Sequence, residues 1–135
     1  MQFPKITRFL SGVAIPVSSL RSRSSCGVGE FPDLVLLGEW CRRTGLDLIQ
    51  ILPVNDTGFD PSPYNAQSAF ALNPVYIHLE DVPGWDICRD AIRNARQDFE
   101  AAERLPYESV LRFKLEMLQR IFDHNRAAIA GDETL

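Results

Sequence analysis

The sequence predicts an α/β fold that opens with a strand–helix–strand unit and continues into a helical segment. Within residues 13–54, two short apolar runs rich in β-branched residues flank one amphipathic helical pattern. Beyond residue 84 the apolar residues recur at helical spacing instead. A strand–helix–strand unit of this length builds two parallel strands joined by a right-handed crossover. The sheet is therefore expected to be parallel.

The composition and net charge of the chain argue against a nucleic-acid or membrane partner. The 135 residues are 45% hydrophobic and 24% charged, as in chains that fold around a core. The chain has 14 Lys and Arg against 18 Asp and Glu, a net charge of −4, so it lacks the basic surface that nucleic acid or an anionic membrane requires. No apolar run approaches the ~18 residues of a membrane span. We expect a soluble, cytoplasmic protein with neither kind of partner.

Each element of the first unit has a local reason in the sequence. The first strand is predicted at residues 13–17, an apolar run before a Ser-rich loop. Pro32 opens a helix with Asp33 in its first turn, and Gly45 closes it. The second strand is predicted at residues 46–54, and its nearly continuous hydrophobicity predicts burial on both faces.

A long irregular segment and two helices follow. Residues 55–73 are rich in Asp, Pro, Ser and Gly, and a loop of this length usually carries function. Residues 74–79 predict another short strand. Helices are predicted at residues 86–103 and 107–129. Two ion pairs at i,i+4 spacing are expected on the second helix: Glu108 with Arg112, and Glu116 with Arg120.

The cysteines and histidines do not form a metal-binding pattern. The three cysteines lie far apart without a CxxC spacing, and the two histidines stand alone. We expect no metal site and three free, buried or half-buried thiols in a reducing compartment. The residues concerned are Cys26, Cys41, Cys88, His78 and His124.

The loop Asp60-Pro-Ser-Pro-Tyr64 is the most informative stretch. Two prolines stiffen the backbone on which Tyr64 is held. A tyrosine ring offers an apolar face to the C–H surface of a sugar, and Ser62 beside it offers a hydroxyl donor and acceptor. On spacing alone, a proline-stiffened turn whose tyrosine anchors it to the core remains an alternative. Acidic loop residues such as Asp56 and Asp60 are expected to be solvated, not a catalytic pair.

Several blocks of the sequence occur in an order found in one enzyme family. The blocks are Gly12–Leu20, Cys26–Phe31, Gln50–Pro53, Ser62–Tyr64 and Ser68–Pro74, followed by the spaced residues Tyr107, Val110, Lys114 and Leu118. In these blocks the chain resembles the amylomaltases, which are 4-alpha-glucanotransferases (disproportionating enzymes) of the clan that contains α-amylase. The likeness covers roughly residues 10 to 122.

The resemblance implies a fold and an activity. The family has a (β/α)₈ barrel with inserted subdomains, and a whole barrel needs about 250 residues. We therefore expect an incomplete barrel: residues 1–83 as its first strands and loops, and residues 84–135 as a helical segment of an inserted subdomain. The family transfers part of a 1,4-alpha-glucan to a new 4-position in glucose or another glucan, by a retaining mechanism and without a cofactor. The resemblance places the catalytic carboxylates outside this chain.

The resemblance also implies roles for single residues. Tyr64 matches the tyrosine that stacks on the sugar ring before the scissile bond, and Ser62 matches a serine along the groove. Gln50 and Asn73 match positions near the strand ends that support the groove, although hydrogen bonds that only fix the loop are an equal alternative for both. The partners implied are maltooligosaccharides or other 1,4-alpha-glucans, together with the remainder of the barrel.

The sequence departs from the family pattern in two places. Ile49 replaces the usual tryptophan, and Asn55-Asp56-Thr57 replaces the commoner Gly-Pro-Thr, which resembles the longer disproportionating enzymes and leaves acceptor preference open. The alternative to a transferase is that this is a truncated chain without catalytic activity, which binds glucans weakly or is only a structural remnant.

Overall fold

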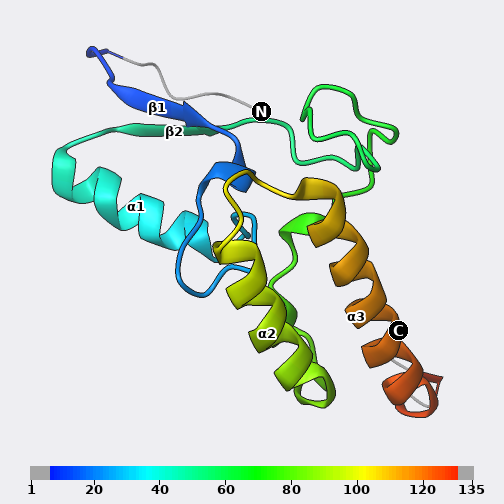
Figure 1. The fold of residues 1–135 in the computed structure, drawn as a ribbon. Helices are drawn as coiled ribbons and strands as arrows, with labels where there is room; N and C mark the ends of the chain where they lie inside the picture. The colour runs from blue at the N-terminus through cyan, green and yellow to red at the C-terminus, as the bar shows by residue number, and fades with distance from the viewer. Residues whose placement is uncertain (1–6, 131–135) are drawn as a thin grey trace.

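The predicted strand–helix–strand unit is present. The computed structural model describes residues 7–130. Strand β1 (Gly12–Ile15), helix α1 (Asp33–Thr44) and strand β2 (Leu48–Ile51) follow in order, and the two strands pair in parallel. The register sets Gly12 opposite Leu48 and Ile15 opposite Ile51. Figure 1 shows α1 lying along one side of the strand pair. The described residues thus have the α/β character that the sequence predicts.

Helix α1 has the two ends that the sequence predicts. Asp33 lies in the first turn and two arginines lie in the last, which suits the helix dipole. Gly45 adopts a φ of 78°, a left-handed conformation that glycine reaches without strain, and its N–H donates to the carbonyl of Cys41. The helix therefore stops where the chain must turn back toward β2.

Both strands are shorter than predicted. Pro16 has no N–H to donate, and the chain leaves β1 there and enters a 3₁₀ turn, η1 (Val17–Ser19). Strand β2 covers only the middle of the predicted range 46–54, although the N–H of Leu52 still donates to a carbonyl of β1 at 3.0 Å. The strand pair is a narrow ribbon of four residues on each side.

The predicted burial of the second strand on both faces is wrong for the described residues. Leu48 is 52% exposed and Ile51 is 40% exposed. Helix α1 lies against one face of the pair, and within residues 7–130 no second layer packs on the other (Figure 1). The apolar residues of β2 thus form a surface without a cover in this part of the chain.

The strand predicted at residues 74–79 is also wrong. This stretch forms two 3₁₀ turns, η2 (Pro74–Tyr76) and η3 (Leu79–Asp81). The carbonyls of Val75 and Ile77 accept hydrogen bonds from the Lys114 ammonium, at 2.6 and 2.8 Å. Because a buried side chain satisfies these carbonyls, the stretch needs no neighbouring strand.

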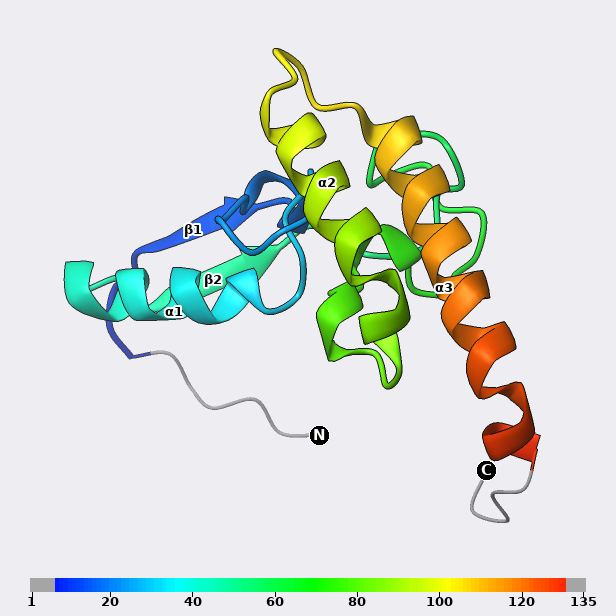
Figure 2. The ribbon, with the colours of Figure 1, turned by 60° about the horizontal axis from the view of Figure 1, so that its bottom comes forward.

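The two predicted helices are confirmed with shifted ends. Helix α2 (Arg89–Glu100) follows a 3₁₀ turn, η4 (Trp85–Cys88), and helix α3 spans Tyr107–Ala130. Figures 1 and 2 show α2 and α3 side by side and running in opposite directions. The ion pairs Glu108–Arg112 and Glu116–Arg120 are present at 2.8 and 2.6 Å. One buried cluster joins these elements: Leu79, Cys88, Ile92, Met117 and Ile121.

A second buried cluster joins the loop after β1 to the start of α3. Close backbone packing makes this possible, since a Cβ added to Gly29 would lie 2.1 Å from the carbonyl oxygen of Val17. The loop from Ser25 to Glu30 is buried throughout. The members of the cluster are Val17, Val28, Val75, Tyr76, Tyr107, Val110 and Leu111.

The exposed strand face leads to a first prediction. Because an apolar surface in water favours association, we expect the 135-residue chain to self-associate, and a Leu48→Thr/Ile51→Thr variant to shift toward monomer. Threonine is β-branched and therefore suits a strand at both positions. Sedimentation velocity over a range of protein concentrations measures the effect, with Leu115→Gln on the exposed side of α3 as the control. A wild-type chain that stays monomeric at high concentration would contradict the prediction.

Candidate functional site

The irregular segment after β2 is a loop that closes on itself. Asn55 and Leu72 form an antiparallel bridge at its base. The N–H of Asp56 donates to the carbonyl of Ala71 at 2.9 Å, and the N–H of Asn73 donates to the carbonyl of Val54 at 3.0 Å. Figure 1 shows this loop projecting beyond the end of β2, beside the start of α3. Its position at the carboxyl end of a parallel strand is where α/β folds place ligand sites.

Asp60 organises the turn that carries the candidate binding residues. One of its carboxylate oxygens accepts from the N–H of Ser62 at 2.8 Å, and the other accepts from the Asn65 amide at 2.7 Å. These hydrogen bonds, first that of Asn65 and then that of Ser62, lower the pKa of the Asp60 carboxyl. Asp60 is therefore an ionised structural residue, in keeping with the expectation that the loop acids are not a catalytic pair.

The two candidate substrate-binding residues lie on the surface of this loop. Tyr64 is 69% exposed, which rules out the alternative that its ring anchors the turn to the core of the described residues. Ser62 is half-buried two residues earlier. The structure thus presents the ring of Tyr64 to solvent, beside the half-buried Ser62, on a turn that the Asp60 carboxylate holds in shape.

Asn73 lies in a buried polar cluster beneath the loop. Its side-chain oxygen accepts from the N–H of Val75 at 3.0 Å, and its amide nitrogen donates to the hydroxyl of Tyr107 at 2.8 Å and to that of Thr57 at 3.2 Å. The Thr57 hydroxyl in turn donates to the carbonyl of Asp60 at 2.6 Å. The first residue of α3 is thus connected through Asn73 and Thr57 to the turn that carries Ser62 and Tyr64.

Gln50 does not join this cluster. It is exposed on β2, opposite Ala14 in the register, and its side chain makes no hydrogen bond with the described residues. The two residues predicted to support the groove therefore differ in setting. Asn73 holds the base of the loop, whereas Gln50 is exposed on β2 and takes no part in the buried polar cluster.

A buried ion cluster lies on the same helix, two turns after Tyr107. The Lys114 ammonium is fully buried and donates to Glu30 at 2.5 Å as well as to the carbonyls of Val75 and Ile77. The other carboxylate oxygen of Glu30 contacts the Nδ1 atom of His78. All three donors of the ammonium therefore have acceptors.

Burial is the largest influence on the pKa values of Lys114 and of the neighbouring Cys26. Burial lowers the pKa of Lys114, and the attraction of Glu30 acts in the opposite direction. Burial also raises the pKa of the Cys26 thiol to about 11, so the thiol stays protonated at neutral pH. The Cys26 N–H donates to the Glu30 carboxylate at 3.1 Å. These groups are shut away from solvent and act as structure, not as reactive groups.

Cys26, Cys41 and Cys88 are free and buried, as predicted. Within residues 7–130 no cluster of three or more His, Cys, Asp or Glu side chains is arranged to hold a metal ion. The helices in this range are too short or too polar to cross a membrane.

Sequence reasoning did not foresee the pairing of Glu30 with Lys114. Both residues stood in the family blocks, but 84 positions separate them. One local signal was present, because Lys114 falls on the apolar face of α3 between Val110 and Met117. A charged residue in an apolar helical stripe requires a buried partner, and the acidic candidates could have been searched for one.

The comparisons with known proteins agree on one family. A family profile described as 4-alpha-glucanotransferase matches residues 15–134. A 4-alpha-glucanotransferase from Chlamydia caviae is 45% identical over 97 residues, which cover 71% of this chain and 18% of that protein. The 4-alpha-glucanotransferase DPE2 of Oryza sativa is 40% identical over 121 residues, which cover 83% of this chain and 12% of that protein. The crystal structure of amylomaltase from Corynebacterium glutamicum superimposes with a TM-score of 0.73 at 30% identity, covering 88% of this chain and 19% of that one. The chain thus spans less than a fifth of the length of each.

Removing the Lys114 charge should test the buried ion cluster. Lys114→Met leaves the Glu30 carboxylate buried without its cation and two carbonyls without a donor, so we expect a loss of about 3–5 kcal/mol in the free energy of unfolding. Arg120→Gln, which breaks an exposed ion pair with Glu116 on the same helix, should cost less than about 1 kcal/mol. Urea unfolding followed by circular dichroism measures both, and equal losses would show that the cluster does not stabilise the fold.

Removing the Tyr107 hydroxyl should loosen the loop. Tyr107→Phe leaves the Asn73 amide without its best acceptor, a change worth about 1–2 kcal/mol at a buried site. We expect hydrogen exchange of the backbone amides in residues 56–73 to accelerate by about tenfold, measured by mass spectrometry. Tyr64→Phe is the control, because that exposed hydroxyl has no partner among the described residues. Unchanged exchange in Tyr107→Phe would contradict the proposed link between α3 and the loop.

Proposed function

Because the chain belongs to the 4-alpha-glucanotransferase family, we propose that it takes part in transferring a segment of a 1,4-alpha-glucan to a new 4-position in glucose or in another glucan. The observation that carries the proposal is the family match over residues 15–134, which includes the whole loop around Tyr64. Maltooligosaccharides are the proposed donors, and the proposed reaction needs no cofactor.

The proposed chemistry retains the configuration of the transferred sugar. An aspartate attacks the anomeric carbon while a glutamate protonates the leaving oxygen, and the 4-hydroxyl of the acceptor then resolves the glycosyl-enzyme intermediate. We assign none of these roles to residues of this chain. The acidic residues near the loop and the core already have structural partners: Glu30 with Lys114, Asp33 with the N–H of Glu30, Asp56 with the N–H of Gly58, and Asp60 with Ser62 and Asn65.

The proposed architecture is the first part of a (β/α)₈ barrel. Residues 1–83 would supply the first strands and loops, and residues 84–135 the start of an inserted helical subdomain. Two observations support this proposal. The two strands are parallel with a helix on one face, and the apolar side chains of Leu48 and Ile51 need a further layer to cover them. The remainder of the barrel is therefore the proposed partner of this surface.

Tyr64 and Ser62 are the proposed contribution of this chain to the substrate groove. An exposed tyrosine ring on a stiff turn can stack on the apolar face of a glucose ring while its hydroxyl stays available to the polar rim of the sugar. The hydroxyl of Ser62, two residues away, can exchange hydrogen bonds with the same glucan. Asn73 supports the groove from below by fixing the loop. Gln50 would support it by contacting groove residues that lie in the remainder of the barrel.

The proposed setting of the reaction follows from composition and from the relatives. Three free thiols suit a reducing cytoplasm, which is where we place the protein. The acidic net charge gives no support to a nucleic-acid or membrane partner. The Asn55-Asp56-Thr57 sequence and the similarity to the rice protein favour acceptors of the kind that the longer disproportionating enzymes use. We propose that the transfer reaction serves starch and glycogen metabolism.

Substitution of Tyr64 tests the proposed function in the active enzyme that contains this segment. Tyr64→Ala removes the stacking surface, and we expect kcat/KM for maltotriose disproportionation to fall at least about tenfold, which is about 1.4 kcal/mol of transition-state binding. Tyr64→Phe keeps the ring and should recover most of the activity. Phe122→Ala, an exposed aromatic residue on α3, is the matched control. Wild-type kinetics in Tyr64→Ala would contradict the proposed role of Tyr64 in the substrate groove.

A further inference from the structure

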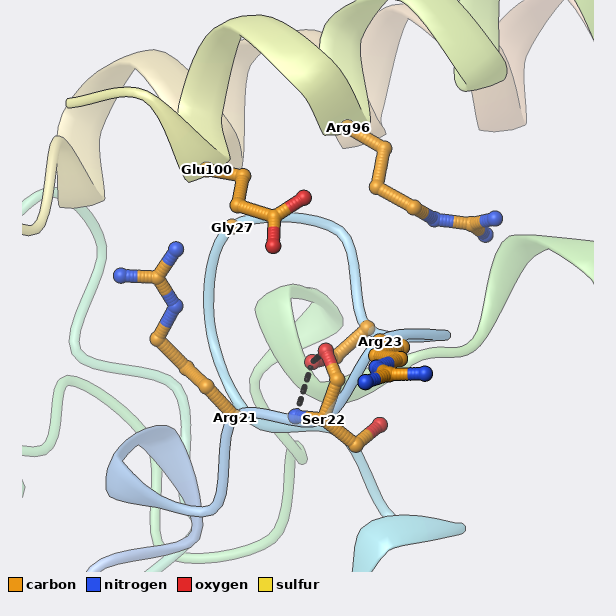
Figure 3. Close-up of a pocket in the computed structure, with 7 residues that line it drawn as sticks. Arg21, Ser22, Arg23, Gly27, Arg96 and Glu100 are labelled. Carbon is orange, nitrogen blue, oxygen red and sulfur yellow. Dashed lines mark hydrogen bonds between the residues drawn. The ribbon is translucent and has the colours of Figure 1, made fainter.

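A cavity of about 430 Å³ lies between the loop after η1 and helix α2. Its volume falls in the range of small-molecule pockets, roughly 300–1,000 Å³, and is much larger than one small ion requires. Figure 3 shows Arg21 from the loop and Arg96 from α2 on opposite sides of the cavity, with Glu100 between them. The other residues that line it are Ser22, Arg23, Ser25 and Gly27.

The cavity gathers positive charge in an acidic protein. Three arginines line it against a single glutamate, although the whole chain carries a net charge of −4. A guanidinium group presents five N–H donors in a planar fork that matches phosphate and carboxylate oxygens. Such a concentration of arginine around one hollow favours an anionic ligand.

Much of the donor capacity of these arginines is unused. One nitrogen of Arg96 is paired with Glu80 at 2.6 Å, but its Nε is buried and has no acceptor in the described part of the chain. Arg21 makes one long hydrogen bond, 3.4 Å, to the carbonyl of Phe99. The Arg23 side chain has no hydrogen-bond partner within residues 7–130. The guanidinium groups of Arg21 and Arg23 can therefore take up oxygens of a ligand without giving up strong bonds, while Arg96 adds its charge from across the cavity.

The floor of the cavity is a serine turn with its own hydrogen bonds. The N–H of Ser22 donates to the Ser25 hydroxyl at 2.8 Å, and that hydroxyl donates back to the carbonyl of Ser22 at 2.9 Å (Figure 3). The hydroxyls of Ser22 and Ser24 lie 2.9 Å apart. These bonds hold Arg21 and Arg23 on a fixed backbone, so their side chains alone need to order when a ligand binds.

We propose that this cavity binds the phosphate monoester of a small sugar. The phosphate lies among the guanidinium groups that line the cavity, with Arg21 on one side and Arg23 and Arg96 on the other (Figure 3), and the Glu100 carboxylate accepts hydrogen bonds from sugar hydroxyls. A bare phosphate would leave most of the cavity empty and Glu100 facing a like charge, whereas a neutral sugar would leave the guanidinium groups of Arg21 and Arg23 without an anionic partner. The site is a further one beyond the proposed function, because the proposed glucan substrates carry no charge, and Tyr64 does not line it.

Calorimetric titration of the 135-residue chain at constant ionic strength tests the proposal. Glucose 1-phosphate, inorganic phosphate and glucose are the three probes. We expect saturable binding of glucose 1-phosphate, at least tenfold tighter than that of phosphate, and no measurable binding of glucose. Equal affinity for phosphate and glucose 1-phosphate would overturn the sugar-phosphate assignment, and the absence of saturable binding would overturn the site.

Matched variants locate the site. Arg21→Gln/Arg23→Gln alters two exposed side chains, so the fold is kept, and we expect glucose 1-phosphate affinity to fall at least tenfold. Glu100→Gln should narrow the difference between glucose 1-phosphate and phosphate. Arg93→Gln, one turn before Arg96 on α2 but outside the cavity, should bind as the wild type does. An equal loss in Arg93→Gln would show that binding depends on overall charge and contradict the site.

Chemical protection gives an independent readout. Glucose 1-phosphate should shield Arg21 and Arg23 from modification by phenylglyoxal, while Arg42 and Arg43 at the end of α1 stay reactive. Peptide mass spectrometry distinguishes these positions. Uniform modification of all four arginines in the presence of the ligand would count against the proposal, whatever the calorimetry shows. Because none of these measurements involves glucan transfer, failure here leaves the proposed transferase function standing, and the reverse also holds.

Discussion

The buried ammonium of Lys114 is the constraint on which the arrangement of the other segments depends. An ammonium ion removed from water is costly unless each of its three protons finds an acceptor. Here the acceptors come from two distant parts of the chain, the carboxylate of Glu30 and the carbonyls of Val75 and Ile77. Satisfying one cation therefore fixes the loop after β1 and the turns before η3 against helix α3. This explains why residues 74–79 form turns and not a strand.

The same helix also supports the candidate substrate loop. Tyr107 at the start of α3 bonds to Asn73, which bonds to Thr57, whose hydroxyl holds the carbonyl of Asp60. The side chain of Asp60 then shapes the turn that presents Ser62 and Tyr64. Helix α3 is thus a common support for the core and for the exposed aromatic residue. A buried polar network with its members satisfied favours one arrangement of the loop, because any other leaves donors unpaired.

Sequence reasoning succeeded where local chemistry decides the structure and failed where distant residues decide it. The ends of α1 follow from Asp33 and Gly45, and α3 follows from its apolar spacing, so both helices could be predicted. The apolar run at residues 74–79 resembled a strand because its carbonyl partner, Lys114, lies far along the chain. The hydrophobicity of β2 predicted burial on both faces, which the described residues do not provide, because α1 packs on one face of the strand pair and nothing in residues 7–130 packs on the other. The irregular loop could be predicted from its composition, and Tyr64 could be named as a candidate binding residue. The hydrogen bond from Asn73 to Tyr107 that supports the loop could be seen only in the tertiary structure.

The link between α3 and the groove can be tested directly in the active enzyme that contains this segment. A double-mutant cycle combines Tyr107→Phe with Tyr64→Ala, and kcat/KM for maltotriose disproportionation is measured for the four proteins. If Tyr107 acts by positioning the loop that presents Tyr64, its loss should matter little once the Tyr64 ring is gone, and the double variant should be about as active as Tyr64→Ala alone. Fully additive losses would show that the two residues act independently and would contradict the positioning role of α3.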